Sequence, residues 1–168
     1  TSLEAALSLT KGSDLLVTIG GASVGDHDLV GKVAMNKGMD RSFYKVAMRP
    51  GKPLMAGKLD GLPMVGLPGN PVSSMVCGHV FLRPALRALQ GLKAERMARK
   101  TAPLAASLGK NGPREHYMRA SLQDGVLTAA DRQDSALLTV LTTANALIVR
   151  AANDPARAAG ENVAFINL

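Results

Sequence analysis

The chain has 168 residues, of which 46% are hydrophobic and only 3% aromatic, and its formal net charge is +7. This length suits one ordinary domain or two small ones, and the scarcity of aromatic side chains argues against base stacking on single-stranded nucleic acid. Residues 1–91 carry ten basic and six acidic side chains, and residues 92–168 carry ten and seven. Because neither part is a polycationic arm, we expect small anionic ligands and no nucleic acid.

The cysteine content and the hydropathy of the sequence indicate in which cellular compartment the protein is expected. The single cysteine, Cys77, cannot form an internal disulfide, which favours a reducing compartment. No apolar run approaches the ~20 residues needed to span a bilayer, and the N-terminus does not resemble a secretory leader. We therefore expect a cytoplasmic protein with no membrane partner. The opening TSLEAALS resembles the last turns of a helix, so we expect the native chain to extend upstream of Thr1.

Residues 1–91 alternate helical and extended patterns in the manner of an α/β domain. The continuous apolar run 14–19 predicts a strand covered on both faces. Pro84 is expected to kink the last helix or to start a second segment. The expected elements are a helix over 3–9, strands over 14–19 and 43–48, a helix over 26–37, two short strands joined by a hairpin at Asp60-Gly61, and a helix over 71–89.

After residue 92 the pattern changes to short apolar segments separated by turn signals such as Asn111-Gly112-Pro113 and Asp124-Gly125. This spacing predicts a small all-β barrel or sandwich. We therefore expect two domains, 1–91 and 92–168, with a boundary near 91–99. The first should have a mostly parallel sheet with flanking helices.

Three segments have the residue types of an anion site: GGASVGDHD at 20–28, RPGKP at 49–53 and PGNPVS at 68–73. In the first and third, an apolar strand runs into a glycine-rich turn that opens a helix. Ligands of open α/β sheets bind at this end of the strands, and the free N–H groups of a helix start favour anions. Pro71 suits the first helical turn, with Asn70 as its cap.

Such turns are also ordinary connections, and these match neither the phosphate-binding P-loop nor the dinucleotide fingerprint. The anion interpretation is strengthened by Arg49 and Lys52, two cations that prolines hold in place. Asp26 and Asp28 either hold Mg²⁺ or are favourable acids at a helix start.

The histidines and the cysteine show no zinc spacing and no catalytic triad. His79 is expected to be packed or capped, and His116 has no recognisable partner. Cys77 falls within a helical pattern, which predicts an inert core thiol.

In this order, TIGGASVGDHD, KVAMRPGKPLMAGKL and GLPGNPVSS resemble the molybdopterin molybdenumtransferases, the MoeA family that includes the E domain of gephyrin. The resemblance implies that residues 1–91 are the later part of a molybdopterin-binding domain like those of MoaB and MogA. Residues 92–168 would be the family's C-terminal β domain. Members insert molybdate into adenylylated molybdopterin and release AMP in a step that uses a divalent metal, so Mg²⁺, both substrates and a homodimer are implied.

The resemblance also implies roles for particular residues. Asp28 would be a catalytic and metal-binding carboxylate, Lys45 and Lys52 catalytic cations, and Arg49 and Lys52 the cations that hold molybdate. Arg119 and Ser135 would lie near a further oxyanion position. The remaining implied binding residues belong to the two loops: Gly20, Gly21, Ser23, Gly25, Pro68, Gly69, Asn70, Pro71 and Ser73.

The chain departs from the family pattern in two ways. Arg49 stands where the family has a lysine, which replaces a point ammonium by a planar guanidinium. The family's first domains are absent from this sequence, so an inactive fragment of the transferase is one alternative. A non-catalytic molybdopterin-binding or scaffold module is another, and an adenylylating relative is a third. The sequence does not separate molybdate from tungstate.

Overall fold

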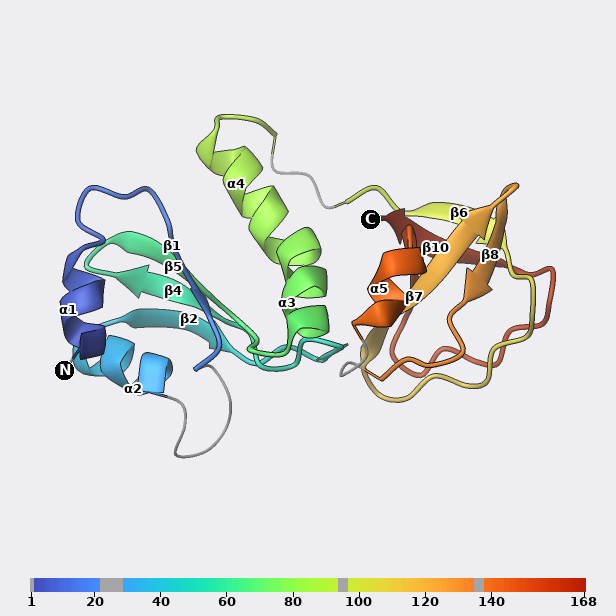
Figure 1. Ribbon diagram of the computed structural model, residues 1–168, viewed down its shortest axis with the longest axis horizontal. Helices are drawn as coiled ribbons and strands as arrows, with labels where there is room; N and C mark the ends of the chain where they lie inside the picture. The colour runs from blue at the N-terminus through green and yellow to red at the C-terminus, as the bar shows by residue number, and fades with distance from the viewer. Residues whose placement is uncertain (1, 22–28, 94–96, 135–137) are drawn as a thin grey trace. The chain divides into compact units, whose positions relative to one another are not determined.

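The computed structural model describes residues 2–21, 29–93, 97–134 and 138–168 (Figure 1). By its internal contacts the chain divides into two compact units. The first unit comprises Thr1–Val46 and Gly51–Leu92, and the second comprises Ala47–Pro50 and Lys93–Leu168. Among the described residues, no helix has the length and apolar character needed to cross a membrane.

The first unit is built on a four-stranded sheet with the order β1-β5-β4-β2. The strands are β1 Leu16–Ile19, β2 Asp40–Tyr44, β4 Met55–Leu59 and β5 Leu62–Leu67. Strands β1 and β5 run parallel, whereas β4 is antiparallel to both β5 and β2. The expected α/β class with flanking helices is confirmed, and the sheet that was expected to be mostly parallel is of mixed direction. The hairpin between β4 and β5 turns at Asp60-Gly61, as expected, with both residues at positive φ.

Helices α1 (Ser2–Ser8) and α2 (Leu29–Asn36) contribute to the core of this unit. Leu7 of α1 and Ala34 of α2 are buried with residues of β4 and β5. Methionine fills much of the space that aromatic side chains would otherwise occupy, because its flexible thioether adapts to irregular gaps. The buried methionines of this cluster are Met39, Met55 and Met64.

The last helical stretch of the first unit joins α3 (Pro71–Cys77), a π-helical turn η1 (Gly78–Leu82) and α4 (Arg83–Leu89) (Figure 1). The N–H of Arg83 donates to the carbonyl of Gly78, five residues back, instead of the usual four. Pro84, which has no N–H to donate, lies in the first turn of α4. The expected disturbance of the helix at this proline is therefore confirmed.

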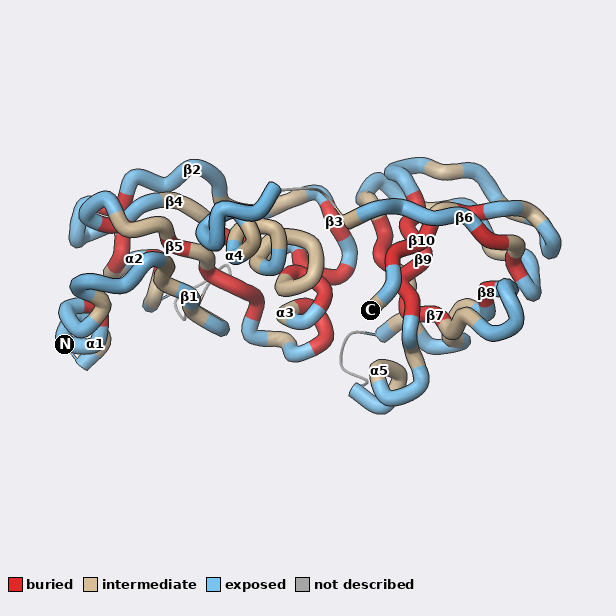
Figure 2. The backbone as a smooth tube through the Cα atoms, turned by 90° about the horizontal axis from the view of Figure 1, so that it is seen from above, coloured by how far each residue is buried: buried red, intermediate tan, exposed pale blue. Residues whose placement is uncertain are grey.

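Two expectations about strands are wrong. Strand β1 is not covered on both faces, because Val17 is 37% and Ile19 70% exposed at this edge of the described sheet (Figure 2). The strand expected over 43–48 instead ends at Tyr44. Lys45 follows at φ 74°, a left-handed conformation that interrupts the extended chain. The next extended residues, Met48–Arg49, form β3, which belongs to the second unit.

The second unit is rich in strands, in agreement with the expected β domain. Its sheet has the order β3-β7-β9-β10-β6, with β8 paired to β7. The five strands after β3 are β6 Lys100–Pro103, β7 Glu115–Gln123, β8 Val126–Ala129, β9 Ala146–Arg150 and β10 Asn162–Asn167. A short helix, α5 (Thr139–Thr143), was not expected from the sequence.

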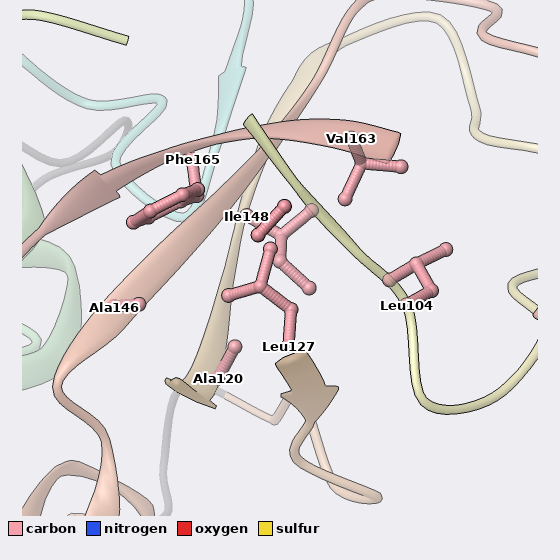
Figure 3. Close-up of a cluster of buried hydrophobic side chains, with 8 residues drawn as sticks. Leu104, Ala120, Leu127, Ala146, Ile148, Val163 and Phe165 are labelled. Carbon is pink, nitrogen blue, oxygen red and sulfur yellow. The ribbon is translucent and has the colours of Figure 1, made fainter. Parts of the chain in front are cut away.

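A compact apolar cluster holds these strands together (Figure 3). Leu127 of β8 and Ile148 of β9 are fully buried, and Phe165 of β10 is buried beside them. The cluster takes alternate residues of β9 and β10, whose side chains share one face of the sheet, although every residue of β9 is buried. This core is separate in composition from that of the first unit, so each unit has its own apolar cluster.

Candidate functional site

The two glycine-rich loops of the first unit lie side by side. Strands β1 and β5 are parallel and in register at Ile19 and Leu67, so their carboxyl ends meet at one edge of the sheet. The N–H of Gly20 donates to the carbonyl of Leu67 at 3.0 Å. A Cβ atom placed on Gly69 would lie 3.3 Å from the Cα atom of Gly20, so the loops approach at backbone distance. The described residues of the two loops are thus adjacent.

Glycine is required at the start of the first loop. Gly21 has φ 67°, a conformation that side chains disfavour, and a Cβ atom there would overlap Val30 of α2. Gly20 is also at positive φ, 83°. The loop therefore leaves β1 through two glycines. Because these residues have no side chains, the backbone of the second loop can lie close to this one.

The second loop ends in a capped helix start. The side-chain oxygen of Asn70 accepts the N–H of Ser73 at 3.1 Å, and Pro71 occupies the first helical turn. Pro68 and Ser73 are buried. The predicted cap at Asn70 and the predicted place of Pro71 are confirmed. Whether these residues bind a ligand stays a prediction.

Lys45 and Lys52 lie on the segment that returns into the sheet. The N–H of Lys45 donates to the carbonyl of Leu54 at 2.8 Å, which fixes its left-handed backbone. Its Nζ atom lies 5.1 Å from the ring centroid of Tyr44, within the range of a cation–π contact. The carbonyl of Lys52 accepts the N–H of Val46 at 3.0 Å, and its side chain is exposed. Both backbones are therefore held, and the Lys52 ammonium remains in solvent.

The motif RPGKP is divided between the units: Arg49 and Pro50 belong to the second, and Gly51 and Lys52 to the first. Arg49 is on β3, directly opposite His116 of β7 in a parallel ladder. Burial and, after it, the charge of Arg49 lower the pKa of His116 and of Arg119. Arg49 is therefore part of a cationic group within the second unit.

Arg119 of β7 is the most unusual side chain of this group. It is fully buried (0% exposed), and its Nη2 atom donates to the carbonyls of Asp134, at 3.0 Å, and Arg132, at 3.4 Å. Its Nε and Nη1 atoms are buried and have no partner among the described residues. Burial and then Arg49 lower the pKa of Arg119, and the charge of Asp134 opposes them. Leaving buried charged donors unpaired is costly, so the two free donor atoms are expected to have a further acceptor.

His116 is a site residue that the sequence did not suggest. It is 7% exposed, and its Nε2 atom is buried without a partner in the described part of the chain. Burial, together with Arg49, Arg119, Arg150 and Arg114, lowers the pKa of His116 to about 4, so its imidazole is neutral at physiological pH. Only the pairing of β3 with β7 brings these distant residues together, and sequence spacing carries no signal of it.

Cys77 and His79 lie outside the loops. Cys77 is buried, its thiol donates to the carbonyl of Gly51 at 3.7 Å, and burial raises its pKa to about 12, which confirms an inert core thiol. His79 is half-buried in η1, and the Nδ1 atom has no partner among the described residues.

Four of the predicted site residues, Ser23, Gly25, Asp28 and Ser135, lie outside the described residues. The described residues contain no group of three or more His, Cys, Asp or Glu side chains that could hold a metal ion. The implied Mg²⁺ site therefore depends on Asp28 and stays a prediction.

Comparisons with known proteins agree with the two units. The sequence model of a family described as "Probable molybdopterin binding domain" matches residues 1–88, and that of "MoeA C-terminal region (domain IV)" matches residues 101–168. A protein of Mycobacterium tuberculosis named molybdopterin molybdenumtransferase 2 is 38% identical over 143 residues, which is 81% of this chain and 35% of that protein. The molybdopterin molybdenumtransferase of Nostoc sp. is 32% identical over 170 residues, covering 93% and 38%.

A solved structure supports the same fold. The MoeA molybdopterin biosynthesis protein of Pyrococcus horikosii superposes with a TM-score of 0.79 at 22% identity, over 99% of this chain and 40% of that one. The chain thus spans 35% to 40% of the length of these three relatives. The order of the motifs, the two matched regions and the fold agree, and the chain belongs to the MoeA family.

Proposed function

We propose that this chain acts in molybdenum cofactor biosynthesis, as part of a transferase that inserts molybdate into adenylylated molybdopterin with release of AMP. The observation that carries this proposal is the buried guanidinium of Arg119, whose Nε and Nη1 atoms have no partner among the described residues. Molybdate is a dianion with four oxygen acceptors. Two guanidiniums supply the charge and the donors that such an ion requires.

The loops of the first unit are proposed to hold the phosphate-bearing pterin. Gly20 and Gly69 bring the two loops to backbone distance of each other, and the second loop ends at the N-terminus of α3, the helix end that favours negative charge. Lys45 and Lys52 add positive charge on the adjoining segment. The backbone course of the two loops is set by Gly21, Pro68 and Pro71. The remaining residues proposed for the two turns are Ser23, Gly25, Asn70 and Ser73.

The chain's residues would act by binding and by neutralising charge, so no protein nucleophile is required. A divalent ion held by Asp28 would add electrostatic stabilisation at the phosphate oxygens. Ser135 is proposed to lie at the oxyanion position of Arg119. A homodimer and a cytoplasmic location complete the proposal.

A non-catalytic pterin-binding or scaffold module is the second candidate. A scaffold gains nothing from a buried guanidinium with unpaired donors, because burying that charge without a partner costs folding free energy. The unpartnered donors of Arg119 therefore favour oxyanion handling.

Calorimetric titration of molybdate and of adenylylated molybdopterin tests the proposal. We expect Arg119→Met and Lys52→Ala each to weaken molybdate binding at least about tenfold, the loss of one charge-assisted contact. Lys58→Ala is the matched control, since Lys58 is exposed on β4, and the variant should bind molybdate within about twofold of wild type. Unchanged molybdate binding in both site variants, with circular dichroism showing intact folding, would refute the assigned roles.

A further inference from the structure

Strand β2 ends at the same edge of the first unit's sheet as β1 and β5. It is antiparallel to β4, and β4 is antiparallel to β5, so β2 runs in the direction of β1 and β5. The N–H of Lys45, the residue after β2, donates to the carbonyl of Leu54, just before β4. Lys45 therefore lies at the edge where the two glycine-rich loops begin, two strand spacings, or about 10 Å, from β5.

Two irregularities of the backbone gather cations around the ring of Tyr44. In a regular strand, residues three apart and residues next to each other project from opposite faces. The register of β2 shifts by a bulge, so that Arg41 lies opposite Gly57 and Tyr44 opposite Met55, two residues apart on β4. Arg41 and Tyr44 therefore share one face. The left-handed backbone of Lys45, at φ 74°, brings its side chain to the same ring.

The ring of Tyr44 contacts both cations. The Cζ atom of Arg41 lies 5.0 Å from the ring centroid and the Nζ atom of Lys45 lies 5.1 Å from it, both within the range of a cation–π contact. Tyr44 is half-buried and packs against the apolar cluster of the first unit, which holds its ring in place. A lysine rotamer that leaves the ring loses this attraction, so the contact narrows the range of positions of the Lys45 ammonium.

The two cations at one ring favour an anionic ligand. Among the described residues, no carboxylate forms an ion pair with Arg41 or Lys45, so their charges add to the positive potential at this part of the sheet. An ammonium that is already held in place binds an anion with a smaller loss of side-chain entropy than a freely moving one.

We propose that Tyr44 is a positioning residue for the anionic ligand of the two loops, and that its ring holds the Lys45 ammonium at the carboxyl edge of the sheet, where this charge contacts a phosphate oxygen. The inference rests on the proposed function, because it takes adenylylated molybdopterin as the ligand. It goes beyond that proposal by giving a role to an uncharged residue that acts through Lys45.

NMR of the full chain labelled with carbon-13 lysine tests the contact in the absence of ligand. Aromatic ring currents shift protons above the ring upfield. The Cε protons of Lys45 should therefore resonate upfield of those of Lys58, which has no aromatic contact among the described residues. Tyr44→Leu should abolish this shift, and Phe43→Leu should retain it. Phe43 is the matched control because it is the neighbouring aromatic residue of β2 and makes no cation–π contact in the described ranges.

Calorimetric titration with adenylylated molybdopterin measures the effect on binding. Lys45→Gln should weaken binding at least about tenfold, and Tyr44→Leu at least about threefold, as expected for the loss of one exposed cation–π contact. Phe43→Leu should bind within about twofold of wild type. If Tyr44 acts through Lys45, the double variant should bind as Lys45→Gln alone does, whereas a purely structural role predicts that the two losses add.

A fluorinated ring separates the cation–π contact from packing. Pentafluorophenylalanine at position 44 retains the ring of Tyr44→Phe and reverses the charge distribution on its face. It should weaken ligand binding at least about threefold relative to Tyr44→Phe. This comparison decides if Tyr44→Leu does not fold.

The outcomes separate the role of Tyr44 from the proposed function. The role of Tyr44 would be overturned by Lys45 protons without an upfield shift, by additive losses in the double variant, or by equal binding with the fluorinated and the unmodified phenylalanine ring. Each of these results leaves the proposed ligand intact. Absence of adenylylated molybdopterin binding by the wild-type chain would overturn both proposals.

Discussion

At the scale of single residues, His116 makes the stability of the second unit depend on pH. Its folded-state pKa is about 4, below the ordinary value of 6.5, because of burial and nearby arginines. The unfolded chain therefore takes up a proton between pH 6.5 and 4 that the folded state excludes. Stability is complete above pH 6.5 and is lost as the pH falls toward 4. The cations that add to the effect of burial on this pKa come from β3, β7, its preceding loop and β9: Arg49, Arg119, Arg114 and Arg150.

We predict that His116→Gln is less sensitive to acid than the wild-type chain. Between pH 7.5 and 4.5 the shift of His116 should cost wild type about 2 to 3 kcal/mol of unfolding free energy, and the variant should be spared that part. Urea unfolding at both pH values measures the difference, and the loss due to carboxylates cancels in the comparison. An equal loss in both proteins would contradict the assignment.

Residue-level features that depend on neighbours in sequence were predictable, and those that depend on strand pairing were not. The cap at Asn70 and the glycines of the two loops follow from local backbone chemistry. The group of Arg49, His116 and Arg119 depends on a ladder between residues far apart in sequence. No sequence periodicity encodes such a pairing, so only the structure identifies His116 as a candidate site residue.

At the scale of elements, glycine positions distinguish a turn from a helix. Gly61 in the β4–β5 hairpin has φ 81°, whereas Gly78 at the start of η1 has φ −58° and open space around a Cβ atom. Alanine is strained at the first position and favourable at the second.

We predict opposite effects of one substitution at these two sites. Gly61→Ala should lower the unfolding free energy by about 1 kcal/mol, and Gly78→Ala should raise it by about 0.5 to 1 kcal/mol. Thermal unfolding followed by circular dichroism measures both. The same sign of change in the two variants would contradict the backbone conformations.

The boundaries of some elements could not be predicted because tertiary pairing decides them. The hairpin and the proline-interrupted helix have strong local signals, and both were predicted. Strand β3 is only two residues long and exists because Met48–Arg49 pairs with β7. The sequence between Tyr44 and Pro50 is as apolar as a strand, yet the left-handed Lys45 ends β2.

At the scale of the molecule, the chain has two apolar clusters, one in each unit. The change near residue 92 to short apolar segments separated by turns indicated two parts, but the inclusion of Ala47–Pro50 in the second unit had no sequence signal. It divides the RPGKP motif, so Arg49 belongs to the unit that has one core and Lys52 to the unit that has the other. The two cations are therefore expected to respond differently to destabilisation of either unit.

We predict that Leu127→Ala and Met64→Ala destabilise different parts of the chain. Leu127 is fully buried in the core of the second unit, and Met64 is buried in that of the first. Each truncation removes contacts and leaves a cavity, which costs about 2 to 5 kcal/mol. Hydrogen exchange should therefore accelerate at least about thirtyfold in β7 and β9 of Leu127→Ala, and change less than about threefold in β4 and β5. Met64→Ala should show the reverse pattern. Equal acceleration of all four strands in both variants would mean that the units unfold together, because separate cores confine the loss of free energy only where each unit can open alone.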